Sequence, residues 1–213
     1  MSEAPTTQER YAAATHSSNL RSSADTVGDA DYLIAAGLSK ARFGTLLMRL
    51  QSEWDASACR IPSRPTRRDI ARAAQQSLSK GISKVTKESS DTARKRLEAT
   101  YRSEKAMLSQ RLRSLSAVRR HLAIKLLLDD LPDESVTDIV LRWLDPACPV
   151  CQGRGKQLQK WSETELSGDA CGCCGGSGKK PEGNDTERLA LSYMSACVGD
   201  ARHGIKQKTA GRH

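Results

Sequence analysis

The chain has 213 residues, a formal net charge of +9 and a pI of about 9.4. Aromatic residues make up only 4% of it and the mean hydropathy is −0.56, so we expect a modest core built from Leu, Ile, Val and Ala. No apolar run approaches the length of a membrane span, and the polar N-terminus lacks the apolar segment of a signal peptide, which argues against a membrane or secreted protein and favours a reducing cytoplasm.

The first part of the chain divides into a polar arm and a helical region. Residues 1–27 are rich in Ser, Thr, Ala and Gln and are predicted to form a flexible, disordered arm. Residues 28–145 are predicted to form one basic helical domain. An early helix of this domain carries an apolar stripe at helical spacing, made of Phe43, Leu46, Leu47, Leu50 and Trp54.

Further helix signals follow after Pro62 and Pro65. Thr66 with Asp69 three residues later is a candidate N-cap and capping box. Asp91 is predicted to cap a longer helix that continues, after a bend, beyond residue 120. A short helix is predicted from Asp133 to Leu144, where Asp145 and Pro146 end it.

The strongest signal in the chain is a pair of C-x-x-C-x-G-x-G elements, which run from Cys148 to Gly155 and from Cys171 to Gly178. Nineteen residues separate the second cysteine from the third, a spacing typical of a four-cysteine zinc site. Two thiolates at i and i+3 on a tight turn both reach one ion. The pattern predicts one zinc ion bound by Cys148, Cys151, Cys171 and Cys174.

The glycines of this zinc-binding knuckle element, residues 146–180, have predicted roles. They allow the chain to turn sharply at positive φ and let backbone N–H groups approach the sulfurs. Because four protein thiolates close the coordination sphere, the site is predicted to be structural. A redox dithiol is the alternative for a C-x-x-C pair, and Cys173 is an alternative ligand to Cys171 or Cys174. We favour Cys174 because it heads the second G-x-G.

The remaining cysteines are Cys59, Cys173 and Cys197, an odd number at irregular spacing that does not form a disulfide framework. After the knuckle element, residues 181–199 are predicted to hold a C-terminal helix, and residues 200–213 a basic tail. The predicted fold is therefore mainly α, a helical domain interrupted by one four-cysteine zinc-finger element.

Positive charge is concentrated in one part of the sequence. Arg60 to Lys125 holds eighteen Lys and Arg against five Asp and Glu, a net +13, so the rest carries −4. Such a block is typical of a surface that binds a polyanion. The candidate nucleic-acid-binding residues cluster around one helix start, where phosphate is favoured. They are Arg64, Arg67, Arg68 and Arg72. The alternative is a solvated helical face.

No catalytic pattern accompanies these features. The sequence has no phosphate-binding glycine loop, no H-E-x-x-H and no G-x-S-x-G. Its histidines are scattered at positions 16, 121, 203 and 213. We expect no enzyme and no small-molecule substrate.

The paired knuckles resemble the cysteine-rich domain of the DnaJ chaperones. That domain has four such repeats and binds two zinc ions, whereas this chain has two repeats, no J-domain His-Pro-Asp and no Gly/Phe-rich stretch. This resemblance implies a zinc-stabilised chaperone or adaptor that binds peptides.

The chain also resembles the lambdoid-phage Q family of late-gene transcription antiterminators. Proteins of the lambda type in this family are of similar size, basic and mostly helical, with a flexible N-terminal arm and a single zinc site of two C-x-x-C-x-G-x-G halves. The segment from Ala35 to Gly44 and the stretch from Trp161 to Leu166 are also similar to that family. The resemblance covers the plan of residues 30–198.

The second resemblance implies a DNA site at a phage late promoter and bacterial RNA polymerase as partners. It implies a factor that travels with the polymerase past terminators in the cytoplasm of the host cell. Only the zinc ligands Cys148, Cys151, Cys171 and Cys174 carry over from that family. An ordinary zinc-stabilised DNA-binding repressor is a further alternative.

Overall fold

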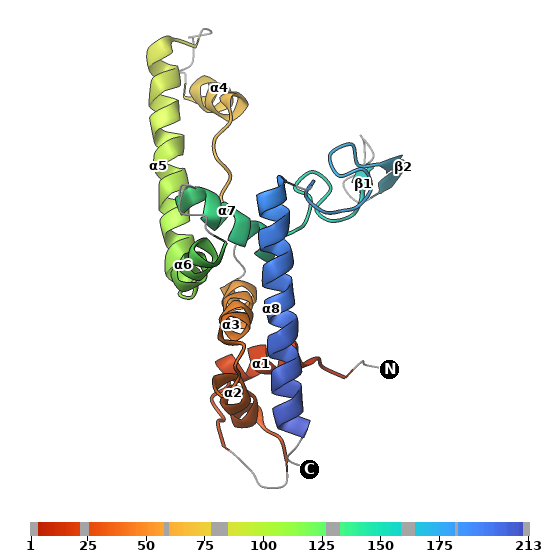
Figure 1. The fold of residues 1–213 in the computed structure, drawn as a ribbon. Coiled ribbons are helices and arrows are strands. Elements are labelled where there is room, and N and C mark those ends of the chain that lie inside the picture. Colours follow the sequence, from red (N-terminus) through yellow and green to blue (C-terminus); the bar gives the residue numbers. More distant parts are fainter. Residues whose placement is uncertain are drawn as a thin grey trace. The chain divides into compact units, whose positions relative to one another are not determined.

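The computed structural model describes residues 4–21, 26–57, 60–77, 85–126, 133–158, 165–181 and 183–210. Its elements are mainly helices, with one small hairpin (Figure 1). In chain order they are α1 Thr7–His16, α2 Asp29–Gly37, α3 Arg42–Ser57, α4 Arg67–Gln76, α5 Lys87–Arg111, α6 Leu115–Lys125, α7 Asp133–Leu144, β1 Lys156–Leu158, β2 Leu166–Ala170 and α8 Asp185–Ala210. This confirms the predicted fold class. Among the described helices, none is long and apolar enough to span a bilayer.

The helices belong to two compact units. The bundle unit comprises Met1–Ser52 with Ser114–His213, and the basic unit comprises Glu53–Arg113. This division differs from the predicted single domain over residues 28–145. It arises because α4 and α5 pack against each other. The basic unit holds fifteen Lys and Arg against seven Asp and Glu, so it carries +8 of the net charge of +9.

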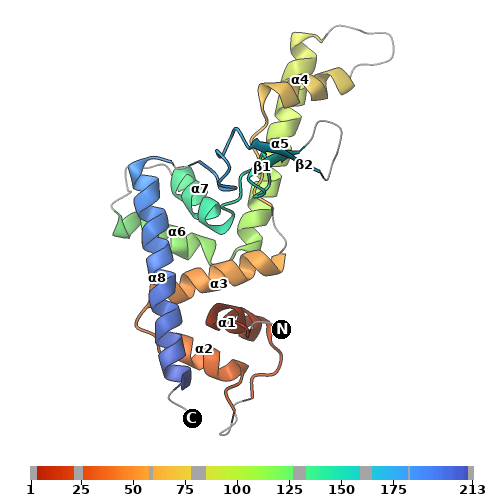
Figure 2. The same ribbon diagram turned by 90° about the vertical axis from the view of Figure 1, so that its right-hand side faces the viewer.

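Helix α8 runs through the bundle unit, with α1, α2 and α7 packed along it (Figures 1 and 2). Its buried side chains recur every three or four residues, as one helix face requires. They are Ala190, Met194, Val198, Ala201, Ile205 and Thr209. The predicted basic tail over 200–213 is therefore wrong up to residue 210, because Ala201 and Ile205 continue the buried stripe and keep the chain helical.

The predicted disordered arm also contains a helix. Helix α1 begins with a capping box in which the Thr6 hydroxyl accepts from the Glu9 N–H, while the Glu9 carboxylate accepts from the Thr6 N–H. Tyr11 and Ala14, one turn apart, are buried, and α1 packs against α2. The polar, alanine-rich composition of residues 1–27 concealed these short-range helix signals.

Helix α3 confirms its predicted apolar stripe, with Phe43, Leu47 and Leu50 buried. It meets α8 at Gly44, where an added Cβ would overlap the Cys197 carbonyl oxygen. Glycine is needed at this crossing because the two backbones approach too closely for a side chain. Next to it the Phe43 ring stacks on His121 of α6, with ring centroids 3.9 Å apart. Burial, followed by the charge of Lys125, lowers the pKa of His121.

The basic unit is a helical pair with a small core. The capping box at the start of α4 is confirmed, because Thr66 and Asp69 exchange side-chain to backbone hydrogen bonds. Helix α5 starts earlier than the predicted cap at Asp91, because Thr86 caps it by accepting from the N–H of Ser89. The long helix predicted beyond residue 120 is divided, because α5 ends at Arg111 and α6 begins at Leu115. Within this unit, the described hydrophobic residues that are fully buried are Ala74, Ala93, Leu108 and Leu112.

Candidate metal centre

The four predicted cysteines come together in one cluster. The sulfurs of Cys148, Cys151, Cys171 and Cys174 all lie within 4.8 Å of one another. The first three are buried and Cys174 is half-buried. The sulfurs of Cys151 and Cys174 are 3.7 Å apart, and a tetrahedral ion with Zn–S bonds of about 2.3 Å requires sulfurs about 3.8 Å apart. The sulfurs are therefore spaced as one tetrahedral metal ion requires.

The two halves of the element are related by an approximate two-fold symmetry that exchanges position n with n+23. The N–H of Cys148 donates to the carbonyl of Gly178 at 2.8 Å, and the N–H of Cys171 donates to the carbonyl of Gly155 at 2.8 Å. Each half thus pairs the N–H of its first cysteine with the last glycine of the other half. This reciprocal pairing brings the two C-x-x-C turns face to face.

The same two glycines support the sulfurs. The N–H of Gly155 donates to Cys151 Sγ and the N–H of Gly178 donates to Cys174 Sγ, both at 3.3 Å. This confirms the predicted approach of backbone N–H groups to the sulfurs, and such hydrogen bonds favour a thiolate.

Only glycine fits these two positions. Gly155 and Gly178 have φ of +74° and +71°, which favours glycine. A Cβ on Gly155 would overlap the carbonyl oxygen of Gly176, and one on Gly178 would overlap that of Gly153. The tight packing of the two halves, as well as the sharp turn, therefore requires the G-x-G motif.

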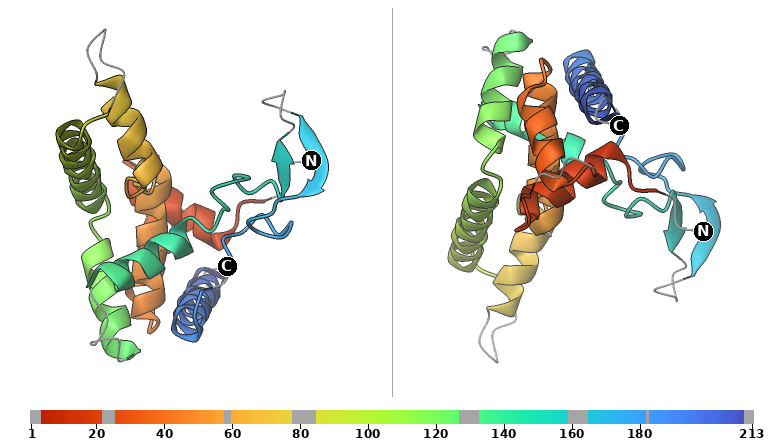
Figure 3. Two further views of the ribbon diagram at one scale, coloured as in Figure 1. Left: turned by 90° about the horizontal axis from the view of Figure 1, so that it is seen from above. Right: turned by 90° about the horizontal axis from the view of Figure 1, so that it is seen from below.

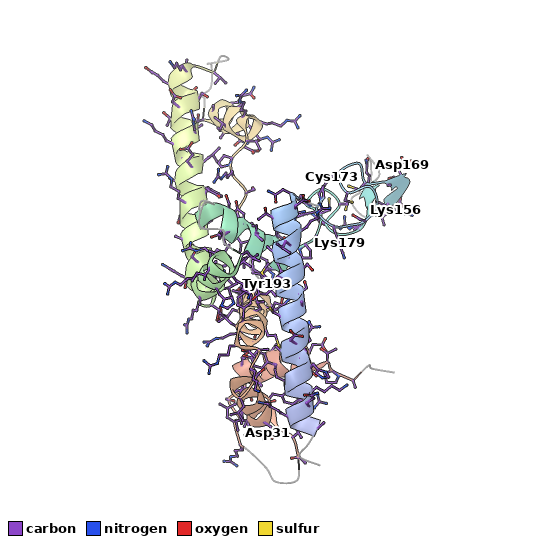
Figure 4. All side chains as sticks on the ribbon, in the orientation of Figure 1. Asp31, Lys156, Asp169, Cys173, Lys179 and Tyr193 are labelled. Carbon is purple, nitrogen blue, oxygen red and sulfur yellow. The ribbon has the colours of Figure 1, made fainter. Side chains whose placement is uncertain are left out.

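Cys174, the favoured ligand of the two adjacent cysteines, is one of the four clustered cysteines. Cys173, which is labelled in Figure 4, is exposed, and a hydrogen bond with the Cys148 sulfur raises the pKa of its thiol. Position 173 is the symmetry equivalent of Val150, which is 65% exposed, and both occupy the outer side of a C-x-x-C turn. Of the other cysteines, Cys197 lies half-buried on α8, and Cys59 lies outside the described residues.

The clustered thiols and the backbone N–H groups beside them shift one another's pKa in opposite directions. The N–H of Cys151 lowers the pKa of the Cys148 thiol to about 6. Burial raises the pKa of Cys151 to about 11, against the effect of the Gly155 N–H. Neighbouring buried thiols resist losing all their protons together, because each thiolate repels the next. A divalent cation removes that repulsion and holds every sulfur deprotonated.

Short backbone pairings close the knuckle element at the end that adjoins α7 and α8. Ala147 forms a β-bridge with Lys179, and the N–H of Lys180 donates to the carbonyl of Pro146 at 2.9 Å. Arg142 of α7 forms an ion pair with Glu187 of α8 at 2.6 Å. The chain therefore enters and leaves the element at one point, between two helices of the bundle unit.

Two described strands between the knuckles form a small sheet. β1 pairs with β2 in antiparallel fashion, with Lys156 opposite Ala170. The hairpin stands clear of α8 (Figure 3), and Leu166 at its second strand is 42% exposed. Most of the stretch from Trp161 to Leu166 lies outside the described residues.

The arginine cluster belongs to the basic unit, whereas the metal centre belongs to the bundle unit. Arg67 and Arg68 lie in the first turn of α4, Arg72 lies one turn further on, and Arg64 lies in the segment before the helix. All four side chains are exposed. The Asp69 carboxylate lies in the same turn and accepts hydrogen bonds from the hydroxyl and the N–H of Thr66, which lower the pKa of Asp69.

No family model, curated protein or solved structure matches this chain.

Proposed function

We propose that this chain is a DNA-binding transcription antitermination factor that engages bacterial RNA polymerase at a phage late promoter and carries it past terminators. The observation behind the proposal is the combination of a closed four-cysteine centre with a separate, strongly basic helical unit. The resemblance of the knuckle halves to those of lambdoid Q proteins supports this combination as one functional plan.

In this proposal the metal is one zinc ion with a structural role. Four thiolates fill a tetrahedral coordination sphere, so no position remains for water or substrate. Cys148, Cys151 and Cys171 are also buried, which keeps solvent from the ion. The centre then holds the knuckle element in its fold and takes no part in a reaction.

The basic unit supplies the proposed DNA contact. It combines a net charge of +8 with exposed arginines around the start of α4. Backbone N–H groups at a helix start and nearby arginines both favour phosphate. The Asp69 carboxylate accepts hydrogen bonds from Thr66 and completes the helix cap. The side chains of Arg67, Arg68 and Arg72 are exposed, so a DNA backbone can reach them.

The experiment is transcription in vitro with bacterial RNA polymerase on a template that carries the DNA flanking this gene, a promoter and a downstream terminator. The fraction of transcripts that pass the terminator is measured with and without the protein. We expect readthrough to increase only when the flanking DNA is present. The matched control is Arg67→Glu/Arg68→Glu, which we expect to abolish the increase while the protein stays folded.

Two other results would contradict the proposal and identify an alternative. Specific duplex binding without a change in readthrough would indicate a repressor. Absence of both, together with capture of unfolded peptides, would indicate an adaptor that uses exposed apolar side chains of the knuckle element, such as Val150 and Leu166.

A further inference from the structure

A cavity of about 460 Å³ lies in the bundle unit where the knuckle element joins α7 and α8. Three parts of the chain line it: the end of α7, the two segments that enter and leave the knuckle element, and the first turns of α8. None of the cluster cysteines lines this cavity, and all of its lining residues belong to the bundle unit. Lys179 marks its position in Figure 4.

One side of this pocket is flat and apolar. Trp143 lines it together with Pro146 and Leu191. The indole N–H donates to Ser195 Oγ at 3.3 Å, which orients the ring between α7 and α8. Trp143 is the aromatic residue of the lining, and an indole ring has a π-face on which planar ligands stack.

The pocket also has four cationic side chains, and two of them are committed to the structure. Arg142 is paired with Glu187 and also donates to the carbonyl of Pro181. Lys180 donates to the backbone carbonyl of Asp145 at 2.6 Å. These contacts hold Arg142 and Lys180 in the wall of the pocket. The other two cations are therefore the ones that can contact a bound anion.

Lys179 and Arg188 are these two cations. Lys179 is exposed and makes no ion pair with another described residue. Arg188 pairs with Asp185, whose side chain is 90% exposed. Because exposed ion pairs contribute little to stability, an anion can compete with Asp185 for Arg188.

We propose that this pocket binds single-stranded nucleic acid, with one base stacked on Trp143 and an adjacent phosphate contacting Lys179 and Arg188. The combination of a π-face and cations at the rim is the usual arrangement for single strands, because every base has a π-face and every phosphate a charge. A paired base stays inside its duplex stack, so the pocket discriminates against double strands. RNA and single-stranded DNA share this chemistry.

The pocket depends on the metal centre. Pro146 is two residues before Cys148, and Lys179 directly follows Gly178. The bridge between Ala147 and Lys179 holds these two pocket walls together. Removal of the metal is therefore expected to disrupt the pocket as well as the knuckles. This links single-strand binding to metal occupancy without any contact between ligand and ion.

The test is fluorescence anisotropy with labelled oligo(U) and oligo(dT) of about 8 nucleotides, within the site sizes common for single-strand binding. Trp143→Leu is expected to weaken binding about tenfold, because one stacked base is lost. Trp143→Phe keeps a ring and is expected to weaken it less. Lys179→Ala/Arg188→Ala is expected to reduce the salt dependence of log affinity by about 1.4, the slope for two phosphate contacts on a single strand.

The matched control removes two exposed cations from the same helix outside the pocket, Arg202→Ala/Lys206→Ala, and is expected to keep the affinity. Thermal melts and metal content are recorded for every variant. If Trp143→Leu does not fold, the affinities of Trp143→Phe and of Lys179→Ala/Arg188→Ala test the proposal instead. A chelator is expected to release the oligonucleotide.

The proposal is overturned if single strands bind with equal affinity to the wild type and all pocket variants. It is also overturned if the pocket binds an acidic, aromatic-containing peptide but neither oligonucleotide. A preference between oligo(U) and oligo(dT) supports the proposal and identifies the natural strand. The result is independent of the proposed antitermination activity, because duplex binding and terminator readthrough are measured separately with the α4 variant Arg67→Glu/Arg68→Glu.

Discussion

The knuckle element and the basic unit both bury few apolar side chains, but different interactions hold their chains in place. In the described part of the knuckle element the buried residues are three of the four clustered cysteines and the two glycines Gly155 and Gly178, and reciprocal hydrogen bonds connect its two halves. In the basic unit, two capped helices pack through Ala74 and Ala93, with no metal-binding cluster among the described residues. Individual residues should therefore matter far more in the first region than in the second.

The two regions differ in what constrains their residues. In the knuckle halves the cysteines and glycines are constrained by geometry, since the sulfurs must converge and the glycines must let two backbones approach each other. The basic unit has surplus charge that its own fold does not need. Like charges in a small unit repel each other, so this surplus favours an external polyanion as its partner.

The largest expected effect is loss of a cluster cysteine. Cys171→Ser removes one of four ligands from a site whose metal binding contributes about 10–16 kcal/mol in comparable small domains. We expect the purified variant to lack zinc and the knuckle element to unfold. Metal analysis and amide NMR spectra measure both. Cys173→Ser is the matched control and should retain zinc. A wild-type melt that strong chelator leaves unchanged would contradict a structural metal.

The second prediction concerns a glycine that touches no metal. Gly178→Ala places a Cβ at positive φ, which costs about 1–2 kcal/mol, and against the Gly153 carbonyl. We expect zinc affinity, measured by competition with a chelator, to fall at least about tenfold. The control is Gly168→Ala on β2, where an added Cβ meets nothing within 4 Å. Equal affinity for both variants would show that the close contact between the two halves is not needed.

A smaller effect is expected for a helix cap in the basic unit. Thr66→Ala removes the hydroxyl that accepts from the Asp69 N–H and should destabilise α4 by about 1 kcal/mol. Faster amide hydrogen exchange in α4 would report this loss. Thr92→Ala, in the interior of α5, changes the same atoms without removing a cap and should not accelerate exchange. An unaltered exchange rate in Thr66→Ala would mean that packing on α5, not the cap, orders α4.

The smallest effect on stability is expected for charge reversal at the start of α4, which should also have the largest effect on DNA binding. Arg67→Glu/Arg68→Glu should leave the melting temperature unchanged, because acidic residues are favoured in the first turn of a helix. Duplex DNA binding should weaken, and the slope of log affinity against log salt should fall by about 2. Arg202→Glu/Lys206→Glu on α8 is the control with the same change of charge. DNA affinity that is equal in both variants would remove the α4 arginines from the interface.

Local signals predicted much of the fold. The 3.6-residue spacing of apolar residues located α3 and α7, and a threonine with an aspartate three residues later located the start of α4. The same kind of signal was overlooked in α1, where Thr6 and Glu9 form a capping box within a polar segment. Average composition over 27 residues hid a pattern that occupies only four.

The pocket at Trp143 could not be predicted in this way. Trp143 and the lysines of the pocket are separated by more than thirty residues in the sequence. Taken alone, Trp143 is an ordinary apolar residue of a helix, and Lys179 and Lys180 are polar residues between two structural elements. The pairing of Ala147 with Lys179 and the hydrogen bond from Lys180 to Pro146 bring these segments together. That pairing depends on the fold of the element between them, which no short-range pattern describes.

The sequence by itself determined the four cysteines, the need for glycine beside them and the location of the positive charge. These are local properties, because ligand spacing and charge depend only on residues that are close together in the sequence. Tertiary structure alone decided that α8 continues to Ala210 and that the basic charge belongs to a unit of its own. The physical reason is that burial and contact depend on which distant segments share a surface, and chain order does not record that.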